Sequence, residues 1–300
     1  MVEEQLTGRP RLGEKILKGA FFCCASISVV TTIAVICILA FETYGFFVEI
    51  PITDFLFGTE WTPLLQPKSY GMLPLLCGTL MIVVGSSIVA LPVGIASAVY
   101  LSEYASDRVR NIVKPVLEIL AGIPTVVYGF FALTFITPML QSIFESTHVF
   151  NAASAAIVVG IMVLPMVASM CDDALQSVPD SLREGAYSLG ATSFEVTIRI
   201  VLPAALSGIF ASFVLAISRA IGETMAVTLA AGATPNFTLN PLESIQTMTA
   251  YIVQVSLGDT PAGTLTYKTL FAVAAVLFTL TLFLNLTASS VMRRFKETYE

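Results

Sequence analysis

Long apolar windows alternate with short charged segments along most of the chain. Five windows contain no Asp, Glu, Lys or Arg, namely Ala20–Phe41, Ser69–Ser102, Ile119–Phe144, Ser146–Cys171 and Thr269–Met292. A sixth window, Ile200–Leu242, is interrupted only by Arg219 and Glu223. One helical crossing of a bilayer core about 30 Å thick needs roughly 20 apolar residues. The pattern therefore predicts an all-α membrane protein with six transmembrane helices.

The composition supports this prediction and narrows the class of protein. Hydrophobic residues make up 56% of the chain and charged residues only 12%, and the mean hydropathy is +0.84. Soluble domains carry about a quarter charged residues, so the polar outer layer that a water-soluble bundle needs cannot be built here. A soluble enzyme, a disordered chain, a disulfide scaffold and a nucleic-acid binder are excluded, and no nucleic-acid partner is expected.

The basic residues predict how the chain is oriented. Twelve of the fifteen Lys and Arg residues fall on one side of the six windows, whereas only Lys68 and Lys268 fall on the other and Arg219 lies within a window. The positive-inside rule then places both termini in the cytoplasm. We expect a cytoplasmic segment over residues 1–19, a transmembrane domain over 20–292 and a cytoplasmic tail over 293–300. The first window exceeds the length of a signal-peptide core, so we expect an uncleaved anchor and not a cleaved signal peptide.

Other candidate chemistry is sparse. The five cysteines show no ligand spacing, and His148 has no second histidine or cysteine beside it, so we expect no metal, no cofactor and no catalytic residue. Two outer loops, Glu42–Lys68 and Pro235–Lys268, are too short for independent domains. Trp61 is expected at the level of the lipid headgroups.

The polar segment Asp172–Pro203, between the fourth and fifth windows, is patterned like a folded element. Ser181 and Glu184 have the spacing of a capping box, and Gly190 suits the left-handed position that stops a helix. These signals predict a helix over Leu182–Leu189. A helix this short is marginal in water and needs a partner to pack against. An ordinary polar connector is the alternative.

This segment also matches a family motif, E-x-A-x3-G-x9-I-x-L-P. The matching residues are Glu184, Ala186, Gly190, Ile200, Leu202 and Pro203. The segment resembles the EAA loop of permease subunits of bacterial ABC importers, in which a coupling helix seats on the ATP-hydrolysing subunit. Gly185 departs from the usual alanine, and glycine costs about 1 kcal/mol of helix propensity there. The resemblance implies a type I importer bundle in the bacterial inner membrane.

Arg219 and Glu223 are the charges inside the fifth predicted span. If one helix runs from Pro203 to about Ala233, Arg219 lies about 24 Å along it, near the middle. A cation there usually faces a bundle interior or an aqueous cavity and has a partner. One interpretation is a structural ion pair with Glu223. The other is an anion site, in which Glu223 accepts a hydrogen bond from the O–H that phosphate retains near neutral pH and sulfate lacks.

A second resemblance favours the anion site. The stretches Ala121–Phe131 and Ser218–Gly232 are similar to the PstC family of phosphate-importer permeases, and Gly222–Val227 fits this family better than its sister family PstA. The resemblance implies substrate translocation by Arg219 and Glu223. It also implies an ABC ATPase partner (a homodimer), a PstA-like second permease subunit and an extracytoplasmic phosphate-binding protein. A sister permease, a permease for another anion and an independent secondary transporter are the alternatives, although no internal repeat supports the last.

Proline and glycine residues recur inside the middle windows. They are Pro92, Gly94, Gly122, Pro124, Gly129 and Pro165. Such residues predict bends or close contacts between helices, and they serve either as hinges or as static packing positions.

Overall fold

The computed structural model describes residues 12–295, and helices form nearly all of the regular structure in that range. The elements are α1 (Leu12–Phe47), α2 (Ile52–Phe57), α3 (Leu73–Val99), α4 (Asp107–Ala121), α5 (Thr125–Phe131), α6 (Thr137–Ile143), α7 (Ala152–Gln176), α8 (Asp180–Ser188), α9 (Ser193–Val196), α10 (Leu202–Ala204), α11 (Leu206–Ile221), α12 (Met225–Ala231), α13 (Met248–Leu257) and α14 (Leu265–Phe295). Three π-helical turns interrupt or extend them, namely η2 (Tyr100–Tyr104), η3 (Ala132–Ile136) and η4 (Thr197–Val201). The predicted all-α fold is confirmed.

Five segments of the described chain are long and apolar enough to cross a membrane. They are Gly13–Phe47, Leu73–Tyr104, Thr125–Ile143, Ala152–Gln176 and Leu265–Ser290. A sixth span results if Ser193–Ala204 and Leu206–Ile221, which meet at a bend of 68°, are taken together. The six predicted windows thus correspond to five continuous spans and one bent span.

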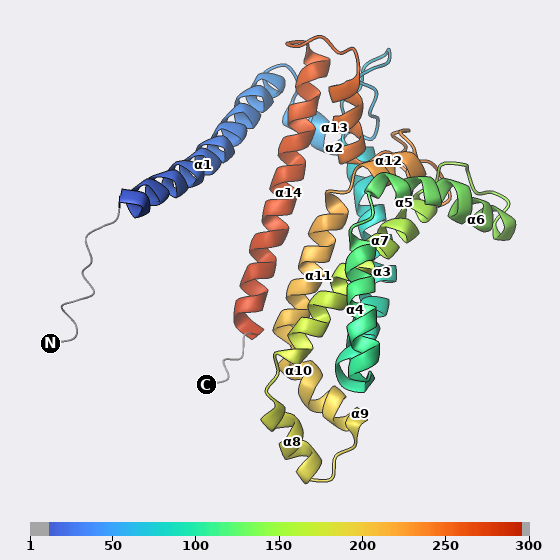
Figure 1. Cartoon of the computed structure of the whole chain (residues 1–300). Helices are drawn as coiled ribbons and strands as arrows, with labels where there is room; N and C mark the ends of the chain where they lie inside the picture. The colour runs from blue at the N-terminus through green and yellow to red at the C-terminus, as the bar shows by residue number, and fades with distance from the viewer. Residues whose placement is uncertain (1–11, 296–300) are drawn as a thin grey trace.

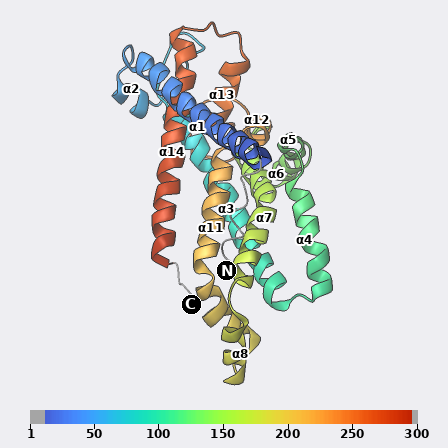
Figure 2. The ribbon, with the colours of Figure 1, turned by 60° about the vertical axis from the view of Figure 1, so that its left-hand side comes forward.

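Helices α3 and α7 pack along their lengths and form the centre of the bundle, with α14 on one side and α4 on the other (Figures 1 and 2). Small residues allow the close approach. A Cβ added at Gly94 would lie 2.6 Å from Val167, and one at Gly160 would lie 2.8 Å from Val89. Pro92 lies inside α3 and is exposed, and the helix continues through it without a break.

The outer loops build a small aromatic core of their own. Phe55, Trp61 and Tyr251 meet edge to face, and Trp61 is only 2% exposed. The Trp61 ring therefore contacts protein side chains, and its depth at the level of the lipid headgroups stays a prediction. The second outer loop also contains α13, which packs against α14 and was not expected from its Pro, Gly and Asn content.

Helix α1 leans away from the bundle and contacts the upper part of α14 (Figure 1). The apolar window of this span has no residue buried within the chain. Cys23, Cys24 and Cys37 are exposed free thiols on it. Residues 1–11 and 296–300, which include the outer parts of the predicted cytoplasmic segments, lie outside the described residues.

Candidate coupling loop and helix break

The predicted coupling helix is present as α8, at the end of the bundle opposite the outer loops (Figure 1). It begins two residues earlier than a Ser181 cap requires, because Pro179 occupies the N-cap and no side chain caps the helix. The predicted Ser181–Glu184 capping box is therefore wrong. Pro179 fixes an extended backbone at the cap, which lets Asp180 become the first helical residue.

Gly190 ends the helix as predicted. Its φ is +86°, and Gly190 N–H donates to Tyr187 O while Ala191 N–H donates to Ala186 O. These two bonds form a Schellman motif, which satisfies carbonyls that the helix end leaves free. Gly185 is different, because its φ is not positive and an added Cβ would meet nothing within 4 Å. Only Gly190 therefore requires glycine for conformational reasons.

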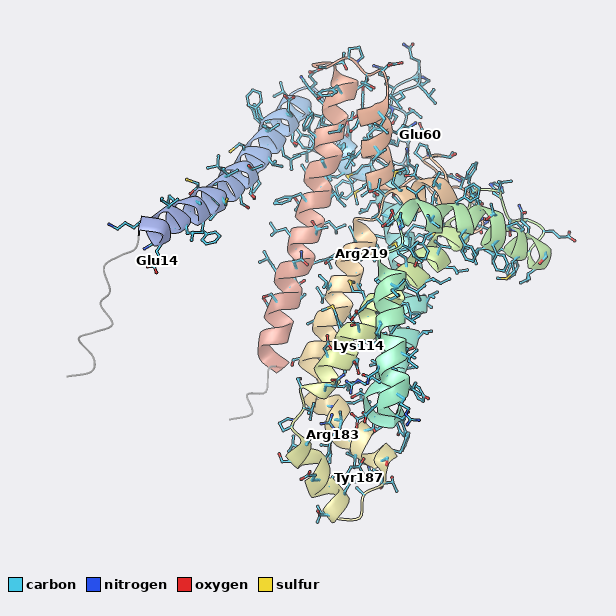
Figure 3. The ribbon with its side chains drawn as sticks, in the orientation of Figure 1. Glu14, Glu60, Lys114, Arg183, Tyr187 and Arg219 are labelled. Atoms are coloured by element: carbon cyan, nitrogen blue, oxygen red, sulfur yellow. The ribbon has the colours of Figure 1, made fainter. Side chains whose placement is uncertain are left out.

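Helix α8 presents one face to the bundle and one away from it. Ala186 is buried and Leu182 packs against the main hydrophobic core, whereas Glu184 is exposed. Leu189 is 90% exposed and Tyr187 is half-exposed, and Figure 3 places Tyr187 at the far end of the bundle from Glu60. The outward face thus combines a carboxylate with large apolar side chains, a combination that suits a protein partner.

The second half of the motif has a different position. Thr192 and Glu195 form the capping box of α9, in which each side chain accepts the backbone N–H of the other residue. Ile200 in η4 and Leu202 in α10 pack against the main core, and Pro203 stands in the first turn of α10. The structure therefore divides the predicted coupling residues into an exposed group on α8 and an anchoring group at the bend.

Two ionic clusters, of which one includes α8, were missed from the sequence. In the first, Arg183 on α8 donates to Glu103 Oε1 at 3.1 Å, to Asp180 Oδ1 at 3.2 Å and to the backbone oxygens of Val178 and Leu175. Arg183 is 15% exposed and Glu103 is 7% exposed. The only signal in the sequence was a basic residue in a polar loop, which does not identify a partner 80 residues away.

The second cluster joins α4 to α7. Lys114 Nζ donates to Asp172 Oδ2 at 3.1 Å and to Asp173 Oδ1 at 2.6 Å, and Arg110 also reaches the buried Asp172. Lys114 lies between the levels of Arg183 and Arg219 in Figure 3. The bond to Asp173 is the largest of the effects that raise the pKa of Lys114. A single window of sequence could not reveal this cluster, because its members lie 58 and 59 residues apart.

Arg219 lies in the last turn of α11 and not in the middle of a long helix. The predicted continuous helix is wrong, because α11 ends at Ile221 and α12 begins at Met225. Among the described residues, the exposed Arg219 guanidinium has neither a hydrogen bond nor an ion pair, so the ion pair with Glu223 is not formed. A cation in the last turn of a helix is favoured by the helix dipole.

Glu223 stands at this break, and its carboxylate is buried. Its Oε1 accepts the N–H of Ala226 at 3.2 Å, so the side chain caps the start of α12. Its backbone oxygen accepts the Thr249 hydroxyl, which contacts Thr247 at the start of α13. Thr79 on α3 accepts the N–H of Met248. A buried hydrogen-bond network thus connects the helix break to the outer helix α13.

His148 is exposed, Cys77 is a partly exposed free thiol and Cys171 is a buried free thiol. Within residues 12–295, no group of three or more His, Cys, Asp or Glu side chains is arranged to hold a metal ion.

Solved structures share the fold. A bacterial alginate ABC transporter in complex with an alginate pentasaccharide-bound periplasmic protein has a chain that matches with a TM-score of 0.63 at 16% identity, covering 97% of this chain and all of that one. The inward-facing MetNI methionine ABC transporter matches with a TM-score of 0.56 at 17% identity, covering 76% of this chain and 95% of that one. The predicted importer-type bundle is confirmed by these matches.

Curated relatives cover most of the chain. A probable ABC transporter permease protein, YqgH of Bacillus subtilis, is 33% identical, with 85% of this chain and 82% of the relative covered. The phosphate transport system permease protein PstC of Mesorhizobium japonicum is 30% identical, covering 85% of this chain and 80% of the relative. PstC 1 of Mycobacterium tuberculosis is 35% identical, covering 76% of this chain and 74% of the relative. The family model of the binding-protein-dependent transport system inner membrane component matches residues 90–297, and the chain belongs to this family.

Proposed function

We propose that the chain is the PstC-type permease subunit of an ATP-driven importer that moves inorganic phosphate into the cytoplasm. The observation that carries the proposal is α8, a short helix with an exposed outward face at one end of the bundle, in a chain similar to PstC permeases. A permease of this kind conducts substrate and does not hydrolyse ATP. Hydrolysis then belongs to a partner ATPase, a homodimer whose groove receives α8.

The proposed coupling runs from α8 to the helix break. ATP binding closes the two nucleotide-binding subunits and displaces α8, whose Leu182 packs against the main core. The bend of 68° before α11 and the break after it divide this region into rigid pieces that can tilt. Arg219, at the end of α11, would then be exposed alternately to the two sides of the membrane.

Arg219 is proposed to bind the anion. Its planar guanidinium matches two oxygens of phosphate, and it is exposed and unpaired within the described chain. Glu223 holds the start of α12 and, in this proposal, also favours the protonated phosphate over sulfate, which has no proton to donate. If Glu223→Gln leaves the phosphate-to-sulfate discrimination unchanged, this explanation of selectivity is wrong.

Further partners follow from the same proposal. One chain of this size provides half of a pathway, so a PstA-like second permease subunit completes it, and lipid covers the remaining apolar surface. Exposed apolar residues, among them Phe130 and Phe135, are available for these contacts. An extracytoplasmic phosphate-binding protein would dock on the outer loops around α2 and α13.

The test is uptake of radiolabelled phosphate by the complete complex, with sulfate as a competitor. Arg219→Gln is compared with Arg199→Gln, which removes an exposed cation from the same chain near the bend. We expect Arg219→Gln to abolish uptake with the complex still assembled, and Arg199→Gln to retain it. Uptake that survives Arg219→Gln would overturn the assignment of Arg219 to the anion path. Equal competition by sulfate would favour a permease for another anion.

A further inference from the structure

The Arg183 guanidinium joins three separate elements at the base of the bundle. It bonds to Asp180 on its own helix, to the Leu175 carbonyl in the last turn of α7 and the Val178 carbonyl just beyond it, and to the Glu103 carboxylate in η2. The last carbonyls of a helix have no partner within it, so the guanidinium satisfies groups at the end of α7. The next residue along the chain, Glu184, lies on the exposed face of α8.

Glu103 is held in place from its own side. Its Oε1 also accepts the Ser102 hydroxyl at 2.9 Å, and its side chain is nearly buried. Glu103 lies in η2, the π-helical turn that continues α3. Because π-helical turns are rare and are frequent at functional sites, a buried ion pair from this turn to the neighbouring loop is a specific arrangement.

The two helices that Arg183 connects are the central pair of the bundle. Helices α3 and α7 pack against each other along their lengths, and each ends near the guanidinium. A displacement of α8 therefore reaches both helices through one side chain. Lysine could not make these contacts together, because its single ammonium lacks the planar fork that serves two carbonyls and a carboxylate.

We propose that Arg183, together with Glu103, is a positioning pair that makes α8, α7 and the η2 end of α3 move as one unit when the ATPase displaces α8. The role goes beyond docking, because the pair faces the bundle and not the exposed face of α8. This inference rests on the proposed function for the ATPase that displaces α8 and for the identity of the transported ion. Loss of the pair leaves α8 able to seat on the ATPase but unable to drive the core helices.

The first experiment measures phosphate transported per ATP hydrolysed by the complete importer in proteoliposomes. Arg183→Gln is expected to keep the ATPase bound through purification and to lower this ratio, because ATP is then hydrolysed without moving the core helices. Arg183→Lys should lower it too, because charge alone does not restore the fork. Arg199→Gln is the matched control and should leave the ratio unchanged. A ratio equal to that of the wild type in Arg183→Gln overturns the proposal.

A second variant covers the case in which Arg183→Gln loses the ATPase during purification. Glu103→Gln keeps an acceptor oxygen and leaves every backbone contact of Arg183 in place, so the ion pair alone is weakened. A lower ratio of transport to hydrolysis with the ATPase still bound supports the proposal. An unchanged ratio overturns it, because Arg183 would then only stabilise the loop.

A distance measurement separates this proposal from the identity of the ion. Nitroxides are placed at Ser106→Cys, just after η2, and Ser188→Cys on α8, in a background with the natural cysteines replaced. In the otherwise unaltered complex, a non-hydrolysable ATP analogue should leave the distance between the labels unchanged, whereas in Arg183→Gln it should shift or broaden it. A distance that already changes without Arg183→Gln overturns the proposal. This result does not depend on whether phosphate is the cargo.

Discussion

Two glycines five residues apart in the coupling loop have opposite structural requirements. Gly190 has a φ of +86° and completes the Schellman motif, so any side chain there is strained. Gly185 lies inside α8 with helical geometry and open space around it. The sequence predicts these two roles from the position of each glycine in the motif, and the backbone geometry agrees with both.

The two positions predict opposite effects of the same substitution. Gly190→Ala should destabilise the end of α8 by about 1 to 2 kcal/mol, the cost of a left-handed residue with a Cβ. Gly185→Ala should stabilise α8 by about 0.5 to 1 kcal/mol through helix propensity. Amide hydrogen exchange over Asp180–Ser188 in the purified complex measures both. Equal protection in the two variants would contradict the assignment, and loss of the ATPase in Gly185→Ala would show that the partner needs the small residue.

Glu223 allows its capping role to be separated from its charge. Glu223→Gln keeps an oxygen that accepts the Ala226 N–H, whereas Glu223→Ala removes it. We expect Glu223→Ala to cost about 1 kcal/mol of stability, the usual value of a lost cap, and Glu223→Gln to cost much less. Thermal unfolding of the solubilised complex gives both values. Equal losses of stability would show that the charge, and not the hydrogen bond, holds α12.

At the scale of elements, the sequence predicted those features that depend on residues close together in the chain. The apolar windows predicted the spans, and Gly190 predicted the end of α8. The start of α8 was misplaced because Ser181 offered a capping pattern that Pro179 pre-empts. The break after Ile221 was missed because Gly222, Glu223 and Thr224 are too few to interrupt an apolar window. Arg183 and Lys114 were missed because their partners lie far away in the sequence.

The α4–α7 cluster predicts a dependence on alkaline pH. The pKa of Lys114 is raised in the folded chain, so its contribution to stability is complete below the unfolded value of about 10.4 and is lost as the pH rises through the folded value. Lys114→Arg keeps its charge beyond that range. Above about pH 10.4, we expect the unfolding temperature of the wild type to fall relative to that of Lys114→Arg. A difference that stays constant with pH would show that Lys114 contributes no charge-dependent stability.

At the scale of the whole molecule, the single chain leaves much of its apolar surface uncovered. Helix α1 has no buried residue in its span window, and its lower part stands apart from the bundle (Figure 1). A sequence can predict that such a helix crosses the membrane, because composition alone decides it. Composition cannot predict what covers the helix, since lipid and a second subunit both accept the same apolar side chains.

The orientation of the whole molecule is the last prediction. Helix α8 and the outer aromatic core lie at opposite ends of the bundle, and twelve of the fifteen basic residues are assigned to the α8 side. In a background without the natural cysteines, Thr59→Cys in the outer loop should react with a membrane-impermeant maleimide in intact cells. Ser188→Cys on α8 should react only after the membrane is permeabilised. The reverse result would contradict the positive-inside assignment, and it would also remove α8 from the compartment that contains ATP.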